Sequence, residues 1–141
     1  MKKFTVLLAG LSALTLVGCV SQEQADVKMG EGCKAAISAM LEPDDSVKEF
    51  KSTSGAPEKT MGSVYRRIKV SYIQNDDFSE EVREGSCLFS EQWGFFKSSH
   101  AALLEQVAWD DQLVGKKDGV IEGDMNAFLK LTEKVDTAMG Q

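Results

Sequence analysis

The sequence opens with two lysines and an apolar run that together have the layout of a secretory signal. Lys2 and Lys3 precede the run from Phe4 to Val17, and small residues close the segment. The run is too short to span a bilayer comfortably, because a membrane-crossing helix needs about 20 apolar residues. Removal of residues 1–18 from the 141 would leave 123. That length is enough for one modest domain but not for two.

The apolar run ends in the four residues Leu16, Val17, Gly18 and Cys19. This ending resembles the lipobox of bacterial lipoproteins, in which the cysteine becomes the lipidated first residue of the mature chain. The resemblance implies that Cys19 carries acyl chains on its sulfur and amino group, which attach the protein to a membrane. Because Val20 rather than an aspartate follows, the resemblance also implies sorting to the outer membrane, facing the periplasm. Three acyl chains would make release negligible, whereas a single chain binds only marginally.

The mature chain is expected to be acidic. The whole sequence has a formal charge of −6, and residues 1–18 contain two lysines and no acidic residue, so the mature charge is −8. This charge argues against nucleic acid as a partner, because phosphates require a basic surface. It also disfavours broad contact with anionic lipid head groups. A solvated surface explains such a charge most simply, and a specific basic partner is the alternative.

Two cysteines, Cys33 and Cys87, remain once Cys19 carries lipid. In an exported chain they favour one disulfide, because the compartment is oxidising. Two separate buried thiols, or a metal site that includes His100, are the alternatives. Zinc sites usually collect four ligands at short spacings, and the sequence offers no such arrangement. We therefore expect a disulfide, no metal and no cofactor.

Apolar periodicity predicts a helix near each end of the mature chain. From Cys33 to Leu41 the apolar residues fall at positions i, i+3, i+4, i+7 and i+8, which is one face of a helix. The second helix follows the capping residue Asp124 and ends at Gly140. Residues 20–30 are polar and lack a clear apolar period. Residues 19–30 are therefore predicted to form a lipidated flexible tether, of which part could join the helix, and residues 31–141 a single α+β domain.

Alternating apolar residues predict strands between the two helices. Residues 64–73 form the clearest strand, a turn follows at residues 74–77, and a second strand covers residues 81–90. Residues 92–97 fit a short extended segment, and residues 101–109 fit a helix or a strand, with the strand slightly favoured. Residues 44–50 are predicted to cap and form a short second helix, and residues 51–61 a loop. The expected fold is a small antiparallel sheet with the N-terminal and C-terminal helices packed on it, and one disulfide between helix and strand.

No residue pattern predicts catalysis. Three acidic pairs, at residues 44–45, 76–77 and 110–111, are explained by turns and helix caps. A nucleophile needs a base within hydrogen-bond reach, and Ser98 and Ser99 stand too close in sequence to His100 to meet that geometry readily. We interpret His100, the only histidine, as a surface or capping residue. We assign no catalytic residue, and an enzyme is the least favoured class of function.

Aromatic and basic residues raise the alternative of an interaction surface. In the simplest interpretation the aromatic side chains fill the core. In the alternative, some of them are exposed beside a basic cluster, since aromatic and arginine side chains often anchor interfaces. Phe95 and Phe96 would face opposite sides of an extended segment, so one could be exposed. The candidate interaction surface comprises Arg66, Arg67, Phe95, Phe96 and Trp109.

These features favour a non-enzymatic, lipid-anchored domain that binds another protein of the cell envelope. The acidic charge, small size and disulfide fit a second hypothesis, an inhibitor of a basic hydrolase such as a lysozyme. A third hypothesis is a carrier of a small apolar ligand, which would require a cavity between helix and sheet.

Overall fold

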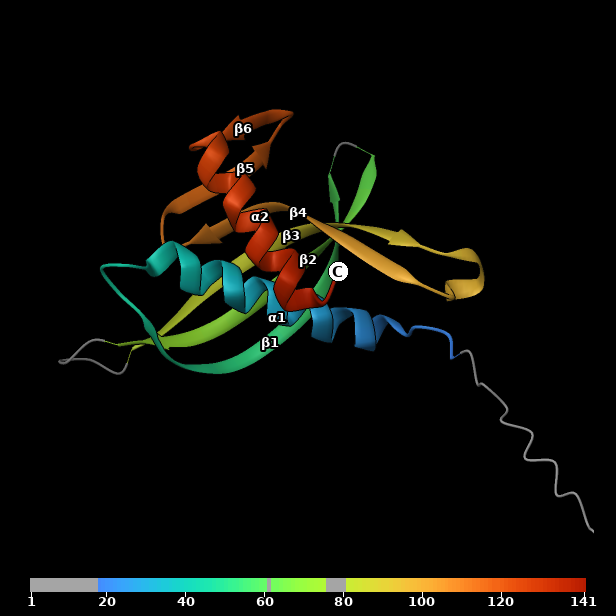
Figure 1. Cartoon of the computed structure of the whole chain (residues 1–141), viewed down its shortest axis with the longest axis horizontal. Coiled ribbons are helices and arrows are strands. Elements are labelled where there is room, and N and C mark those ends of the chain that lie inside the picture. The colour runs from blue at the N-terminus through green and yellow to red at the C-terminus, as the bar shows by residue number, and fades with distance from the viewer. Residues whose placement is uncertain (1–17, 61, 76–80) are drawn as a thin grey trace, which may run out of the picture.

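Two helices lie on one face of a single antiparallel sheet (Figure 1). The structure is a computed structural model that describes residues 18–60, 62–75 and 81–141. The predicted α+β fold is confirmed, with a helix at each end of the domain and a disulfide between helix and strand. The predicted signal peptide as far as Val17 lies outside the described residues.

The six strands pair in chain order, each antiparallel to the next. This order follows from short connections, which join antiparallel neighbours without a crossover. The strongest predicted strand, residues 64–73, lies within β2, and the ambiguous segment 101–109 is strand β4. The bounds of the strands are β1 Val47–Thr60, β2 Ser63–Gln74, β3 Val82–Trp93, β4 His100–Trp109, β5 Gln112–Lys117 and β6 Val120–Glu122.

Helix α1 (Gln22–Leu41) and helix α2 (Met125–Met139) cover what we call the inner face of the sheet. Helix α1 contacts β1 to β4, whereas α2 contacts α1, β4 and β5. At Gly85 of β3 a Cβ atom would lie 2.5 Å from Cδ1 of Ile37, so helix and sheet are in direct contact there. On the opposite face, which we call the open face, none of the described residues forms a helix that covers the sheet (Figure 1).

The core lies between the helices and the inner face. Alternation along β2 turns Ile68, Val70 and Tyr72 inward, and all three side chains are fully buried. The helices contribute the buried apolar residues Ala25, Met29, Cys33, Ala36, Ile37, Phe128, Leu131, Val135 and Met139. Removal of this apolar surface from water, worth roughly 25 cal/mol per Å², favours the packing of both helices on one face.

The tether predicted for residues 19–30 is wrong for residues 22–30, which form the first half of α1. Ser21 caps this helix: its hydroxyl accepts a hydrogen bond from the Gln24 N–H, and the Gln24 side chain accepts one from the Ser21 N–H. Ala25 and Met29 are fully buried, one turn apart. The helix was not evident because its buried positions include small residues, which give a weak apolar period.

Two segments between the helices also differ from the predictions. Residues 47–60 form the long edge strand β1 instead of a short helix and a loop. Most of its side chains are exposed, so it shows little apolar alternation and is defined by its backbone pairing with β2. An edge position also tolerates Pro57. Residues Phe95–Lys97, predicted to be extended, form a 3-10 turn between β3 and β4.

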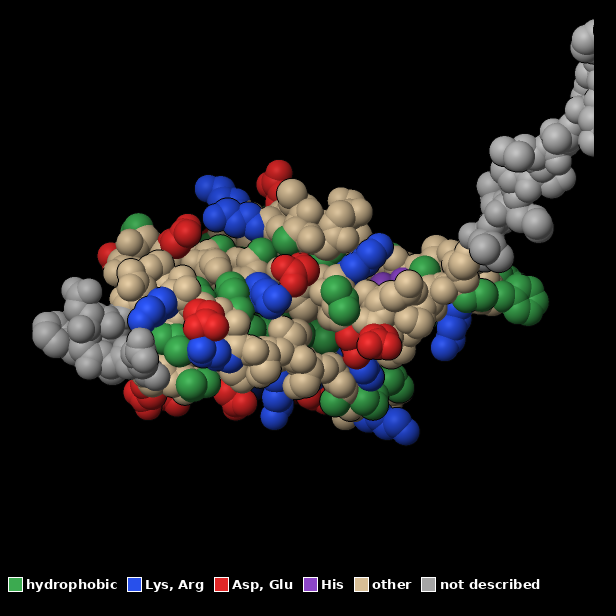
Figure 2. Space-filling model, turned by 90° about the horizontal axis from the view of Figure 1, so that it is seen from below, with side chains coloured by type: hydrophobic (Ala, Val, Ile, Leu, Met, Phe, Trp, Pro, Cys, Tyr) green, Lys and Arg blue, Asp and Glu red, His purple; other side chains and the backbone are tan. Residues whose placement is uncertain are grey.

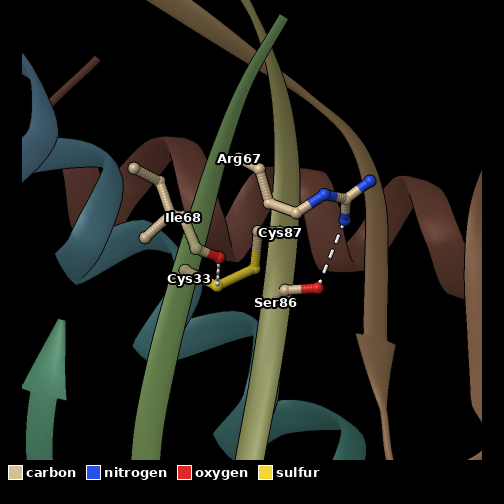
Figure 3. The surroundings of a disulfide bond; sticks show 5 residues. All are labelled: Cys33, Arg67, Ile68, Ser86 and Cys87. Atoms are coloured by element: carbon tan, nitrogen blue, oxygen red, sulfur yellow. Dashed lines mark hydrogen bonds between the residues drawn. A yellow bond between two sulfur atoms is a disulfide. The ribbon is translucent and has the colours of Figure 1, made fainter. Parts of the chain in front are cut away.

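The disulfide joins Cys33 of α1 to Cys87 of β3, with the two Cα atoms 5.6 Å apart (Figure 3). Both residues are fully buried, since Cys33 lies on the inward side of the helix and Cys87 on the inner face. The Cys33 sulfur also lies 3.9 Å from the carbonyl oxygen of Ile68. An oxidised sulfur has no proton to donate, so this is a packing contact. The bond therefore connects α1 to an interior strand across 54 residues of sequence.

We expect the double variant Cys33→Ala/Cys87→Ala to lower the free energy of unfolding by roughly 4 kcal/mol, the value the chain-entropy model gives for a loop of this length. Urea unfolding followed by circular dichroism measures the loss. Cys19→Ser is the matched control, because Cys19 is exposed and unbonded. A loss below about 1 kcal/mol would show that noncovalent packing alone holds the helix in place.

Candidate functional site

A bulge in β4 brings two polar side chains to the open face. Leu88 of β3 pairs with Gln106, but the next residue of β3 pairs with Leu104, which leaves Glu105 as an extra residue. Leu104 and Val107 are both buried in the core. Glu105 and Gln106, between them, therefore both lie on the open face.

Gly115 of β5 accommodates this bulge. It pairs with Gln106 and has a φ of +115°, a conformation that residues with a side chain rarely adopt. A Cβ atom at this position would lie 2.3 Å from the carbonyl oxygen of Glu105. Strand β5 can approach the bulge this closely only because the residue is glycine.

The bulge borders a shallow cavity of about 270 Å³, the open-face groove. Its lining combines three acidic and three basic side chains with the apolar surface of Tyr65 and Leu88. The complete lining is Glu58, Thr60, Tyr65, Arg67, Leu88, Glu105, Gln106, Lys116, Lys117, Asp118 and Gly119. The groove is thus polar and balanced in charge, although the chain as a whole is acidic.

Arg67 of β2 organises one wall of the groove. Its guanidinium makes a bidentate ion pair with Glu58, in which Nη2 donates to Oε1 at 2.7 Å. Further bonds go to Oγ of Ser86 at 3.2 Å and, at 3.4 Å, to Oε1 of Gln106. Hydrogen bonds from Arg67 hold the pKa of Glu58 below its ordinary value, against the opposing effect of burial. The guanidinium is consequently fixed in place rather than free in solvent.

The other wall of the groove is fixed by the bulge residues. Glu105 accepts a hydrogen bond from Oγ of Ser90 at 2.7 Å and pairs with Nζ of Lys116 at 2.9 Å. The Gln106 amide donates to the Lys116 carbonyl at 3.1 Å. Such a surface offers both signs of charge, hydrogen-bonding groups and one tyrosine. This composition suits recognition of another polar protein surface.

Arg66, the neighbour of Arg67, lies on the inner side of the sheet, because successive strand residues point to opposite faces. Its guanidinium donates to both oxygens of Asp26 in α1, at 2.8 and 2.5 Å, and to the Gly55 carbonyl at 3.2 Å. Burial raises the pKa of Asp26, but hydrogen bonds from Arg66 and Gln22 and the charge of Arg66 outweigh it, so this pKa is lowered. The pair fastens α1 to β2.

The five residues of the predicted interaction surface do not form one surface. Arg66 is engaged with α1, whereas Arg67 lines the open-face groove. Trp109 is only 5% exposed and belongs to the core. Phe95 and Phe96 are 87% and 89% exposed, and both lie in the turn between β3 and β4.

Sequence reasoning missed the partners that make Arg67 a site residue. Glu58 lies on strand β1, which was predicted to be a loop. Glu105 and Gln106 reach the groove through a bulge that depends on the pairing partner and has no clear signal in the local sequence. Glycine at position 115 is the one local feature that fits the bulge.

The side chain of His100 is buried, although the residue as a whole is half-buried, and the prediction of a surface or capping histidine is wrong. Its side chain is 4% exposed and its Nε2 lies 2.9 Å from Oε1 of Glu91. Gln22 of α1 donates to the same Glu91 oxygen at 3.0 Å. The imidazole also packs against Trp93, with the ring centroids 4.5 Å apart. His100 therefore helps to join α1 to the β3–β4 hairpin.

Cys19, the predicted acylation site, is exposed and carries a free thiol. The next residue, Val20, donates its N–H to the Lys97 carbonyl at 2.8 Å. The described helices include none that is long and apolar enough to cross a membrane. Over the same described residues, no group of three or more His, Cys, Asp or Glu side chains is arranged to hold a metal ion.

We expect Asp26→Asn to destabilise the protein by about 1–3 kcal/mol at pH 7, because Arg66 would lose a charged partner at a partly buried site. The lowered pKa of Asp26 means that its carboxylate stabilises the fold above its ordinary pKa. That contribution disappears as the pH falls through the lowered value. The difference between variant and wild type should therefore shrink below about pH 4.

Thermal or urea unfolding between pH 7 and pH 3 tests this expectation. Asp110→Asn is the matched control, since Asp110 pairs with Arg83 at a more exposed position and should contribute less. A difference between Asp26→Asn and wild type that stays constant across this pH range would contradict the assignment.

Comparison with known proteins adds no relative to this description. No protein-family model, no curated protein and no solved structure matches the chain.

Proposed function

We propose that this chain is a lipoprotein held at the periplasmic face of the outer membrane by acyl chains on Cys19. The lipobox resemblance of residues 16–19 motivates the proposal. The observation that carries it is the placement of Cys19, which is exposed and separated from the helix cap Ser21 by a single residue. An acylated Cys19 would leave the folded domain intact, because residues 18–20, the described residues ahead of Ser21, take no part in the core.

We further propose that the domain acts as a non-enzymatic binding module for another envelope protein, through the open-face groove. Arg67, Glu105 and Gln106 are already held by neighbouring groups. A partner that meets prearranged groups loses less conformational freedom on binding. Because the lining includes both charge signs, the partner should present acidic and basic side chains together.

Two other functions receive less support from the geometry. A basic hydrolase would be attracted by a concentrated acidic surface, but the groove is balanced in charge. A carrier of an apolar ligand would need space between α1 and the sheet, and Ile37 contacts β3 directly at Gly85.

We expect Cys19→Ser to move the protein from the membrane fraction to the soluble periplasmic fraction, since the change removes the acylation site. The mass of the N-terminal peptide of the wild type should show cleavage before Cys19 and added acyl groups. Cys33→Ala/Cys87→Ala is the control: it removes the two other cysteines of the mature chain together, leaves no unpaired thiol from the disulfide, and should leave the protein in the membrane fraction. An unmodified Cys19 in the wild-type peptide would disprove the lipoprotein proposal.

We expect a photo-reactive residue at Thr60, on the rim of the groove, to cross-link to one envelope protein in living cells. Arg67→Glu should reduce this product by about fivefold or more, as for an arginine at the centre of an interface. Arg83→Glu is the matched control, because it reverses a charge outside the groove. Circular dichroism of both variants establishes that they fold.

A second photo-reactive residue, at Leu129 on the exposed side of α2, controls for nonspecific capture. Equal products from positions 60 and 129, or a product unaffected by Arg67→Glu in a folded protein, would reject the groove as the binding site.

A further inference from the structure

The turn at the end of the β3–β4 hairpin exposes two neighbouring phenylalanines. Phe95 is 87% exposed and Phe96 is 89% exposed, the highest values for large hydrophobic side chains among the described residues. Their rings pack edge to face, with the centroids 5.8 Å apart. Figure 2 shows hydrophobic side chains projecting at this end of the molecule. Together the two rings form one apolar projection, the Phe95–Phe96 turn.

The backbone holds this turn in an uncommon conformation. Phe96 and Lys97 have φ values of +53° and +56°, in the left-handed region that large side chains seldom occupy. The Gly94 N–H donates to the Ser99 carbonyl at 2.9 Å, and the Lys97 N–H donates to the Gly94 carbonyl at 3.0 Å. These bonds stabilise a conformation that points both rings away from the core. Backbone strain of this kind is concentrated at functional positions in proteins.

The charge around the turn differs from that of the rest of the chain. Residues 92–99 contain one basic residue, Lys97, and no acidic residue, in a chain with a formal charge of −6. The Lys97 ammonium lies 5.5 Å from the centre of the Trp93 ring. The two phenylalanines stand at the tip, and Lys97 and Trp93 lie behind them. In a membrane, phenylalanine side chains favour the edge of the hydrocarbon, whereas tryptophan and lysine side chains favour the head groups. A long lysine side chain can reach the phosphates from there.

The turn lies at the same end of the molecule as Cys19. The Val20 N–H donates to the Lys97 carbonyl at 2.8 Å. Cys19 directly precedes Val20, so the Cα atoms of these two residues are about 3.8 Å apart. Figure 1 shows the described N-terminal residues beside the end of this hairpin. Acyl chains on Cys19 would therefore enter a membrane next to the two phenylalanine rings.

We propose that the Phe95–Phe96 turn inserts into the lipid surface beside the acyl chains, as a second membrane contact. The inference rests on the proposed acylation of Cys19. Acylation brings the turn to the membrane, so even a weak contact becomes effective because it is intramolecular. Two contacts also fix the orientation of the domain, whereas a single lipid anchor leaves it free to rotate.

Tryptophan fluorescence tests this proposal with the acylated protein purified from membranes and reconstituted into phospholipid vesicles with brominated acyl chains. Bromine quenches nearby indoles. Trp93 lies at the base of the turn, whereas Trp109 is buried at the opposite end of β4. We expect bromine-dependent quenching of the wild type, and a loss of about half of that quenching or more in Phe95→Ser/Phe96→Ser.

Two further variants make the measurement specific. Trp93→Phe leaves Trp109 alone and should show little quenching. Leu103→Ser/Leu129→Ser removes two exposed leucines elsewhere and should be quenched like the wild type. Equal quenching of Phe95→Ser/Phe96→Ser and the wild type would overturn the proposal. A change in oligomeric mass in detergent caused by the phenylalanine substitutions, with unchanged quenching, would overturn it in favour of a second copy of the chain.

The test separates this proposal from the proposed function. If the N-terminal peptide shows that Cys19 is not acylated, the lipoprotein proposal fails. The turn can then be examined alone, by coupling the exposed Cys19 thiol to a maleimide phospholipid in the same vesicles. Bromine quenching that depends on Phe95 and Phe96 would still support insertion, and its absence would reject it.

Discussion

Helix α1 is attached to the sheet at three levels, and the arrangement of the other elements depends on this attachment. Just ahead of the helix, Val20 bonds to Lys97 of the hairpin turn. Farther along, Asp26 pairs with Arg66, and Cys33 is bonded to Cys87. A backbone hydrogen bond, an ion pair and a covalent bond respond to different conditions, so we expect that neither acid nor reductant alone would break all three attachments. Helix α2 packs on α1, so the position of α2 depends on how α1 is attached to the sheet.

The consecutive residues Arg66 and Arg67 show how strand alternation divides the side chains of the sheet between the helix-covered face and the open face. Strand alternation sends one guanidinium toward α1 and the other toward the groove. The inner arginine stabilises the contact between helix and sheet, whereas the outer one is bonded to Glu58 at the edge of the open face. The same alternation places Ile68 and Cys87 in the core. Substitutions on the two faces should therefore have separable effects, on stability at Arg66 and on the proposed binding at Arg67.

The sequence predicted those parts of the fold that have strong local patterns. The Asp124 cap, the Gly140 end of α2, the alternation of β2 and the cysteine pair are all present. The long strand β1 was missed because its exposed side chains hide the alternation. The first half of α1 was missed because small and polar residues surround its buried positions.

The candidate site was less predictable than the fold, because it is made by pairing between distant strands. The sequence singled out Arg67 but not the bulge that places Glu105 and Gln106 opposite it. Period-two alternation predicted that Phe95 and Phe96 would point to opposite sides. The left-handed backbone at Phe96 exposes both instead.

The capping box at Ser21 also has a mechanical consequence. The reciprocal bonds between Ser21 and Gln24 cap the helix only two residues after Cys19, at Ser21. Only Val20 separates Cys19 from the helix cap, so no long flexible segment is present there that could extend under a pulling force on residue 19. Such a force passes into α1 and, through the sulfur–sulfur bond, into the middle of β3. The end of the chain at residue 19 and the sheet are thus rigidly connected, so a tilt imposed at that end would turn the open face by the same angle.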